Sequence, residues 1–291
     1  MKIGFVGLGV MGGPMARHLV AAGHDVAGYN RSADKAQAWA GAHGGRFAAT
    51  VAAAAEGADL LILCVGKDED VRQVVTEAVA VLPRGAVVVD HTTTSAKIAR
   101  EMAALCDAHG LAFLDAPVSG GQAGAENGQL SVMAGGDAAA LETARPAVMA
   151  YAKAIQHMGP SGSGQLTKMV NQIAIAGVVQ GLAEAVHFAR VAGLDTDAAY
   201  DAISKGAAQS WQMDNRWKTA AKGEFEFGFA VDWMRKDLGL VLDEARANGA
   251  RLALTALVDQ FYAEVQAMGG NRWDTSSLAA RLQTPGPSSE A

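Results

Sequence analysis

The stretch that decides the fold is Ile3-Gly4-Phe5-Val6-Gly7-Leu8-Gly9-Val10-Met11-Gly12, near the start of the 291-residue chain. An apolar run that favours a β-strand ends at Gly7, and a helical pattern runs from Met15 to Val20. The Gly-x-Gly-x-x-Gly spacing between them permits a tight turn, close approach of backbone to a pyrophosphate, and close packing of helix on strand. The N-terminus of the helix offers N–H groups and a positive dipole end to the phosphates. We therefore expect a dinucleotide to bind at Gly7, Leu8, Gly9, Val10, Met11 and Gly12.

Further apolar runs follow this turn and alternate with helical patterns. They cover residues 25–29, 60–65, 86–90, 112–116 and 130–134. Continuous apolar runs are typical of parallel strands that are buried on both faces. Alternation of such strands with helices predicts an α/β Rossmann fold, a doubly wound sheet with helices on both faces.

The pattern changes after the Gly/Ser-rich segment 159–164. Helical patterns cover residues 165–192, 197–204, 231–248 and 254–268, with almost no strand signal. We therefore predict a dinucleotide-binding domain over residues 1–160 and an all-helical domain over 161–283, starting with a long interdomain helix. The Pro/Ser-rich end, 284–291, is predicted to be a disordered tail. The long helix is nearly uncharged in its middle and must be buried between domains or subunits, so we expect a homodimer or homotetramer.

Composition excludes several classes of protein. The net charge is −6 and the pI about 5.6, without a Lys/Arg cluster, which argues against nucleic acid as a partner. Cys64 and Cys106 suggest no disulfide framework and fit a reducing cytoplasm. The N-terminus lacks the pattern of a signal peptide, and the longest uncharged stretch is too short to span a bilayer comfortably. Scattered histidines predict no metal site.

The end of the second predicted strand bears on the choice of cofactor. NAD-binding units usually carry an Asp or Glu there for the ribose 2′-OH, whereas this chain has Asn30, Arg31 and Ser32. Arg31 and Ser32 can pair with a 2′-phosphate, and Asn30 adds no repulsive charge. We expect NADP rather than NAD, with a solvated arginine in a turn as the alternative.

Lys168 is the residue with the strongest chemical signal. Asn171 and Gln172 follow it three and four residues later, so the three polar groups share one face of the long helix. Gly164, one turn earlier, leaves room for a ligand. Burying a lysine is costly unless it has an anionic partner or a role, although the side chain could also extend to solvent.

A second loop offers an anion site. Ser119, Gly120 and Gly121 lie just beyond a strand that ends near Ala116, where open α/β sheets bind ligands. Consecutive small residues expose backbone N–H groups, which can bind a carboxylate. A plain turn fits these residues equally well.

Four motifs occur in the order found in the 3-hydroxyisobutyrate dehydrogenase family, and the chain resembles that family over nearly its whole length. They are Gly7-x-Gly9-x-Met11-Gly12, Asp115-Ala116-Pro117-Val118-Ser119-Gly120-Gly121, Gly162-x-Gly164-x-x-x-Lys168-x-x-Asn171 and Lys236-Asp237-Leu238. The resemblance implies a Rossmann domain, a long interdomain helix and an all-helical domain. It implies that Lys168 is the catalytic lysine, that Ser119, Gly120 and Gly121 bind the substrate carboxylate, and that Asn171 orients the substrate. It also implies that Lys236 reaches toward the cofactor, and that Val65, Gly66 and Thr93 line the nicotinamide side.

Two features leave the substrate open. Many members of the family carry Asn at the position of Gln172, and the Lys-x-x-Asn-Gln pattern looks more like tartronate semialdehyde reductases. Gln172 can orient a hydroxyl as Asn does but reaches further. Trp211 could limit the size of the substrate or belong to a packed core. Tartronate semialdehyde, glyoxylate, succinic semialdehyde, methylmalonate semialdehyde and serine-like substrates all remain candidates.

From this resemblance we expect hydride transfer between a nicotinamide and the carbon that bears the hydroxyl or oxo group. Lys168 would donate a proton in reduction and accept one in oxidation. An ordinary lysine has a pKa of about 10.4, so oxidation should improve at alkaline pH. The alternatives are an NAD-dependent 3-hydroxyisobutyrate dehydrogenase and a related imine reductase, although imine reductases generally replace the lysine. A 6-phosphogluconate dehydrogenase would need a longer helical domain, and a non-catalytic NADP-binding protein would have lost the lysine.

Overall fold

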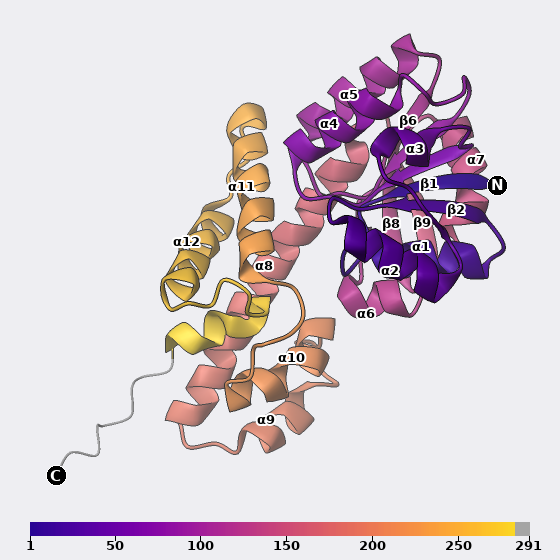
Figure 1. Cartoon of the computed structure of the whole chain (residues 1–291). Coiled ribbons are helices and arrows are strands. Elements are labelled where there is room, and N and C mark those ends of the chain that lie inside the picture. Colours follow the sequence, from indigo (N-terminus) through magenta and orange to yellow (C-terminus); the bar gives the residue numbers. More distant parts are fainter. Residues whose placement is uncertain (283–291) are drawn as a thin grey trace. The chain divides into compact units, whose positions relative to one another are not determined.

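The computed structural model describes residues 1–282, so the predicted tail 284–291 lies outside the described residues (Figure 1). The chain divides into two compact units, Met1–Lys168 and the part that begins at Met169. The division falls inside the long helix α8, Ser163–Val191, whereas the domain boundary predicted from the sequence lies just before this helix.

The first unit is built on a single nine-stranded sheet. The strands are β1 Lys2–Val6, β2 Asp25–Tyr29, β3 Arg46–Phe47, β4 Leu60–Leu63, β5 Val87–Asp90, β6 Ala112–Asp115, β7 Val118–Ser119, β8 Leu130–Gly136 and β9 Ala152–Gly159. Their order is β3-β2-β1-β4-β5-β6-β8-β7, with β9 paired to β8. Strands β1 to β6 pair in parallel, so the carboxyl ends of these strands lie along one edge of the sheet.

Helices cover both faces of this sheet. They are α1 Gly12–Ala21, α2 Ala33–His43, α3 Val51–Ala55, α4 Asp68–Ala78, α5 Ala96–Ala108, α6 Gly121–Glu126 and α7 Ala138–Val148. Strand β4 shows why its sequence is continuously apolar: Leu60 and Ile62 join the core under α1 and α7, while Leu61 and Leu63 join the core under α4 and α5. The predicted doubly wound Rossmann fold is confirmed.

The sequence did not predict every strand correctly. Strand β8 pairs antiparallel with β6 and β7, so the expectation that all apolar runs form parallel strands was wrong for β8. Strands β3, β7 and β9 were not predicted at all. Strand β9 alternates buried or half-buried residues with exposed ones and carries polar side chains such as Lys153 and Gln156, so it lacks the apolar run on which the prediction depended.

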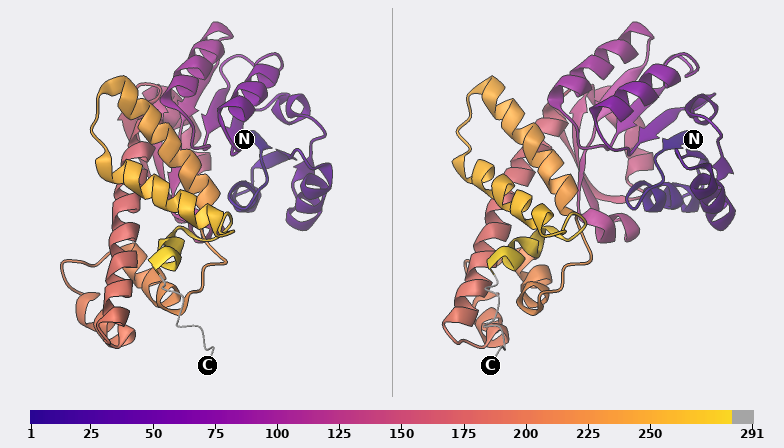
Figure 2. Two further views of the ribbon diagram at one scale, coloured as in Figure 1. Left: turned by 90° about the vertical axis from the view of Figure 1, so that its left-hand side faces the viewer. Right: turned by 60° about the vertical axis from the view of Figure 1, so that its left-hand side comes forward.

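The second unit is helical among its described residues, with one isolated β-bridge between Ala230 and Asp274. Its elements are the remainder of α8, α9 Thr196–Ile203, α10 Trp211–Lys222, α11 Val231–Asn248, α12 Ala253–Ala267 and the 3₁₀ helix η1 Thr275–Leu282. Helices α11 and α12 lie side by side, joined by a short turn after Gly249, whose left-handed backbone ends α11 (Figure 2). The all-helical second part of the prediction is confirmed.

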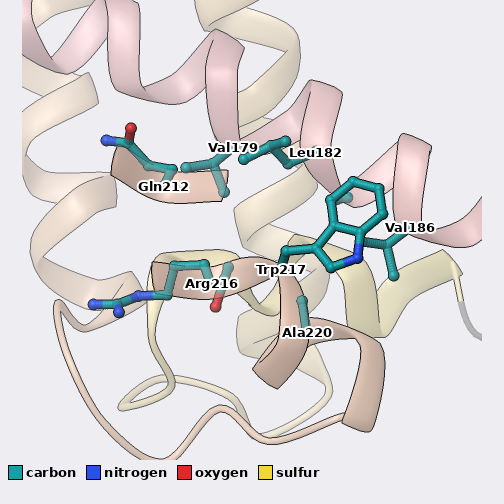
Figure 3. Close-up of a pocket in the computed structure, with 9 residues that line it drawn as sticks. Val179, Leu182, Val186, Gln212, Arg216, Trp217 and Ala220 are labelled. Carbon is teal, nitrogen blue, oxygen red and sulfur yellow. The ribbon is translucent and has the colours of Figure 1, made fainter. Parts of the chain in front are cut away.

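A small cavity lies between α8 and α10. Figure 3 shows Val179, Leu182 and Val186 of α8 facing side chains of α10, among them Trp217. Its volume of about 10 Å³ holds no more than about one water molecule, so it is a packing gap and not a substrate site. Trp211, at the start of α10, is 54% exposed, and the guanidinium carbon of Arg216 lies 4.9 Å from its ring centroid. The alternative that Trp211 belongs to a packed core is therefore wrong.

Helix α8 is long and apolar enough to cross a membrane by length and composition alone. A core helix passes the same test, and one such helix is weak evidence for a membrane span. Gln172 favours the core helix, because it is buried and donates a hydrogen bond to the carboxylate of Asp237 on α11.

Candidate active site

The glycine turn has the shape that a dinucleotide requires. Gly7 has φ of +99°, and a Cβ atom there would lie 2.1 Å from the carbonyl oxygen of Cys64. A Cβ atom at Gly12 would lie 1.9 Å from the carbonyl oxygen of Gly7, whereas one at Gly9 would meet nothing within 4 Å. The turn therefore packs tightly against the protein at Gly7 and Gly12 and is accessible at Gly9. A phosphate at Gly9 would lie close to the backbone and to the N-terminus of α1. These residues fit the pyrophosphate of a nicotinamide cofactor.

The end of β2 connects to this turn. The backbone N–H of Leu8 donates a 3.1 Å hydrogen bond to Oδ1 of Asn30. Arg31 follows with a side chain that is 90% exposed, and its Nη1 lies 3.7 Å from Oδ1 of Asp70 on α4. Ser32 precedes the first turn of α2. Residues 29–32, at and just after the end of β2, include no acidic side chain that could accept a hydrogen bond from a ribose 2′-OH.

The loops after β4 and β5 are joined by a hydrogen bond. The N–H of Val65 donates to Oγ1 of Thr92 at 3.0 Å, and the N–H of Thr92 donates to Oδ1 of Asp90 at 2.9 Å. Gly66 packs closely against Asp70, since a Cβ atom there would lie 2.6 Å from its Oδ2. Thr93, half-buried, lies between Thr92 and Thr94 in the second of these loops. The structure thus brings the predicted nicotinamide-side residues Val65, Gly66 and Thr93 to neighbouring strand ends.

The predicted carboxylate loop lies after β6. Ser119 ends the short strand β7 and pairs with Ser131 of β8. Gly120 and Gly121 have φ of +132° and +61°, and α6 begins at Gly121. Both glycines are exposed and have no side chain, so an anion can approach the backbone N–H groups of this turn.

Asp115, at the end of β6, caps the N-terminus of α8. Its carboxylate accepts hydrogen bonds from the N–H groups of Gly162 at 2.7 Å and Gln165 at 2.9 Å. Burial raises the pKa of the Asp115 carboxyl above its ordinary value, and the hydrogen bonds from the N–H groups of Gly162 and Gln165 oppose this shift. A Cβ atom at Gly164 would lie 2.3 Å from the carbonyl oxygen of Asp115, so only glycine lets the helix approach β6 so closely. This contact fixes the first turn of α8 in the first unit.

The side chain of Gln165 extends the contact to the loop after β5. Its Nε2 donates to the carbonyl oxygen of Thr92 at 2.7 Å, and its Oε1 accepts from the N–H of Thr94 at 3.0 Å. Lys168 follows one turn later on the same helix and is only 8% exposed. The sequence predicted a partly buried lysine here, and its burial in the structure agrees with that expectation.

His91 lies beneath these loops. Its Nδ1 is 2.6 Å from the carbonyl oxygen of Ala116, and its Nε2 is 2.7 Å from the hydroxyl of Tyr151. Since a carbonyl oxygen can only accept, the proton is on Nδ1, and the Tyr151 hydroxyl donates to Nε2. Complete burial lowers the pKa of His91 to about 4, so the ring is neutral near neutral pH.

The second unit holds the other predicted polar residues. The side-chain amide of Asn171 donates to Oε1 of Gln172 at 2.8 Å, and Nε2 of Gln172 donates to Oδ2 of Asp237 at 2.7 Å. The ammonium of Lys236 lies 3.1 Å from Oδ1 of Asp237. Gln172 is buried with both ends of its amide in use, whereas Asn171 is half-buried.

Sequence reasoning assigned no role to several of these residues. Asp115 was quoted as part of a motif, and Gln165 was not singled out. A charged residue at the end of an apolar strand was a signal for Asp115. A glutamine between the Gly-x-Gly pair and Lys168 was a weaker signal for Gln165, because its partners lie 73 and 71 residues away. Within residues 1–282 no group of three or more His, Cys, Asp or Glu side chains is arranged to hold a metal ion.

Comparison with known proteins agrees with this arrangement. Residues 2–159 match the family of the NAD-binding domain of 6-phosphogluconate dehydrogenase, and residues 162–282 match the family described as NAD-binding of NADP-dependent 3-hydroxyisobutyrate dehydrogenase. An uncharacterized oxidoreductase of Shewanella frigidimarina is 61% identical over 97% of this chain and 98% of its own length.

Solved structures are similar over the whole chain as well. The 3-hydroxyisobutyrate dehydrogenase of Mycobacterium tuberculosis with L-serine is 35% identical, with a TM-score of 0.89 over 97% of this chain and 99% of that one. Psf3 in complex with NADP⁺ and 2-OPP is 26% identical, with a TM-score of 0.87 over 97% of this chain and 100% of that one. The chain is therefore an NAD(P)-binding oxidoreductase that acts on CH–OH groups, and it belongs to the 3-hydroxyisobutyrate dehydrogenase family of β-hydroxyacid dehydrogenases.

Proposed function

We propose that this protein is an NADP-dependent β-hydroxyacid dehydrogenase or reductase that interconverts a small hydroxy acid with its semialdehyde or oxo acid. One observation carries the proposal: Lys168 is buried on the first turns of a helix whose N-terminus is hydrogen-bonded to Asp115 and to the loop around Thr93. If the nicotinamide binds at the carboxyl ends of the neighbouring strands, a lysine beside them is in a position to exchange a proton with the substrate.

The residues then have separate tasks. A bound nicotinamide supplies or accepts the hydride. In reduction the Lys168 ammonium donates a proton to the oxygen of the substrate, and in oxidation the neutral amine accepts it. Ser119 and the N–H groups of Gly120 and Gly121 bind the carboxylate, which is why small acids are preferred to plain alcohols.

The second unit contributes the orientation of the substrate. We assign substrate binding to Asn171 and Gln172, with the Asn171 amide held by Gln172 and Gln172 held by Asp237. The bond to Gln172 restricts the orientation of the Asn171 amide, and an amide carries both a donor and an acceptor, as recognition of a hydroxyl or oxo group requires. Lys236 is assigned to the cofactor.

NADP is the proposed cofactor because Arg31 follows β2 where NAD-binding units have an acid. Its guanidinium is exposed and can pair with a 2′-phosphate, while Asn30 is held by Leu8. The match to an NADP-dependent family and the likeness to Psf3 with NADP⁺ support this choice. Substitution of Arg31 by Ala should lower kcat/KM with NADPH about 10-fold while leaving kcat/KM with NADH nearly unchanged. An equal loss of kcat/KM with NADPH and with NADH would show that Arg31 does not select NADP.

We also propose that the protein is a cytoplasmic homodimer or homotetramer whose subunits meet at the C-terminal end of α8. Phe188, Val191 and Leu194 are large exposed apolar residues there, and they line a hollow of about 660 Å³ together with Ile203. The lining of this hollow is mainly apolar, with Glu184 and His187 among its residues, and it fits the same surface of a second copy. The proposed location rests on the sequence, whose two cysteines, Cys64 and Cys106, suggest no disulfide framework.

The experiment is to measure consumption of NADPH and NADH with glyoxylate, tartronate semialdehyde, succinic semialdehyde and methylmalonate semialdehyde. The wild type is compared with Lys168→Ala and with Lys222→Ala, an exposed lysine at the end of α10. We expect turnover of at least one of these acids with NADPH, a loss of about 10²- to 10⁴-fold in kcat for Lys168→Ala, and no loss for the control. Tight NADPH binding without turnover of any of them would reject the proposed reaction.

A further inference from the structure

Gln165 makes two hydrogen bonds that enclose a single residue of the opposite loop. Its Nε2 donates to the carbonyl oxygen of Thr92, and its Oε1 accepts from the N–H of Thr94, so the backbone is held on both sides of Thr93. The side chain is 0% exposed. An amide side chain offers a donor and an acceptor side by side at any pH, whereas an ionised carboxylate has no donor.

The side chain of Gln165 joins α8 to the loop and does not cap the helix. The N–H groups at the start of α8 are already satisfied by Asp115, so the helix needs no further cap from Gln165. An apolar side chain of the same size would leave the Thr92 carbonyl oxygen and the Thr94 N–H buried without this partner, so Gln165 also contributes to stability. Its two bonds have a second consequence, because a fully bonded buried amide fixes the geometry of the backbone that it joins.

The geometry fixed in this way concerns the proposed proton donor. Gln165 and Lys168 are three residues apart on one helix and share a face. On the other side, the loop around Thr93 is joined to the next loop by the bond from the Val65 N–H to Oγ1 of Thr92. A continuous chain of hydrogen bonds thus runs from the loop after β4, through the loop after β5, to the turn before Lys168.

We propose that Gln165 is a positioning residue, which sets the place of Lys168 relative to the loop at Thr93. This inference rests on the proposed function, because it takes Lys168 as the group that exchanges a proton. A displacement of about 1 Å in a reacting group can lower a rate about 10²-fold, so releasing one end of this chain should affect kcat more than binding.

The test compares Gln165→Met, which keeps the volume and removes both bonds, with Gln180→Met. Gln180 is another buried glutamine of α8, but its amide bonds Glu184 of the same helix. We expect kcat with NADPH and the best acid of the panel to fall about 10- to 100-fold in Gln165→Met, with KM and the NADPH dissociation constant within about threefold of wild type. Gln180→Met should keep the wild-type kcat. Wild-type kcat in Gln165→Met, or an equal loss in Gln180→Met, would overturn the inference.

A second readout needs no turnover. The Thr94 N–H is bonded to Gln165, while the Gly162 N–H is bonded to Asp115. In hydrogen exchange of the protein without cofactor, Gln165→Met should therefore speed exchange at Thr94 about 10-fold or more and leave Gly162 near its wild-type rate. Unchanged exchange at Thr94, or equal acceleration at Thr94 and Gly162, would show that Gln165 does not specifically fix the loop around Thr93.

Gln165→Glu supplies a variant that decides the matter if the methionine variant does not fold. A glutamate here can accept from Thr94 at any pH, but it can donate to Thr92 only when protonated. Its kcat relative to wild type should therefore rise as the pH falls. A constant ratio across pH would count against the inference. If Lys168→Ala is inactive while the Gln165 variants are normal, only this inference fails, whereas full activity in Lys168→Ala removes the proposed function itself.

Discussion

The two ends of helix α8 differ in their surroundings, because the N-terminal end is buried and hydrogen-bonded and the C-terminal end is exposed and apolar. At the N-terminal end, the N–H groups of Gly162 and Gln165 bond to the buried carboxylate of Asp115, and the Gln165 side chain is 0% exposed. At the C-terminal end, Phe188 and Val191 are 69% and 73% exposed.

This difference separates two uses of one element. Hydrogen bonds are directional and fix atoms to within a fraction of an ångström, which a proton-transferring lysine requires. Apolar contacts are non-directional and suit association over a surface. The N-terminal end of α8 is built for placement, and we infer that the C-terminal end is built for assembly.

A matched pair of glycines in α8 gives the largest expected contrast. A Cβ atom at Gly164 would lie 2.3 Å and 2.4 Å from the carbonyl oxygens of Asp115 and Met133, whereas one at Gly181 would meet nothing within 4 Å. Gly164→Ala should lower the free energy of unfolding by about 3 kcal/mol or more, because neither backbone can yield easily. Gly181→Ala should raise it by about 0.5–1 kcal/mol, because alanine favours the helix. Denaturant unfolding of both variants measures this contrast, and a destabilised Gly181→Ala would mean that this part of α8 is as closely covered as its start.

The second contrast concerns pH. His91 has a pKa of about 4 in the folded protein against 6.5 in the unfolded chain. Between these values the unfolded chain binds a proton that the folded protein does not, so stability is complete above pH 6.5 and falls as the pH drops toward 4. The loss amounts to about 3 kcal/mol.

Unfolding at pH 7 and pH 4.5, in wild type and in His91→Gln, isolates this contribution. The variant should lose less stability on acidification than the wild type does. An identical pH dependence in the two proteins would show that His91 titrates normally and that the strand ends beneath the site are less rigid than the structure indicates.

The smallest expected effect on stability belongs to the C-terminal end. Phe188→Ser should change the free energy of unfolding of the subunit by only about 0.5 kcal/mol, because the ring is exposed. The same change should shift the protein toward monomer in analytical ultracentrifugation, since it removes apolar area from the proposed contact. Met149→Ser, at an exposed methionine after α7, serves as the control. An oligomer unaffected by Phe188→Ser would place the assembly surface elsewhere.

The parts of the fold that were predictable have local sequence patterns. The turn from Gly7 to Gly12 and the run from Leu60 to Leu63 show their structure within a few residues, because strand and helix periods are short. Strand β9 was missed because one side of it is exposed and polar. Its pairing with β8 is a tertiary contact that local periodicity does not report.

The same reasoning applies to the site. Lys168, Ser119 and the glycines could be proposed from motifs, because each motif is contiguous. The connection from Asp115 to Gln165 spans 50 residues, and no short pattern reports it. The partner of Gln172, Asp237, lies 65 residues away, so no short pattern reports the hydrogen bond between Gln172 and α11.

The most direct test of the central claim is the pH dependence of kcat in both directions for wild type and Lys168→Ala, with NADPH or NADP⁺ and the best pair of acids. If Lys168 exchanges the proton, wild-type reduction should slow and oxidation should quicken as the pH rises. Lys168→Ala should lose about 10²- to 10⁴-fold in kcat and lose this pH dependence, while still binding NADPH. A variant that keeps the wild-type kcat and the wild-type pH profile would contradict the account.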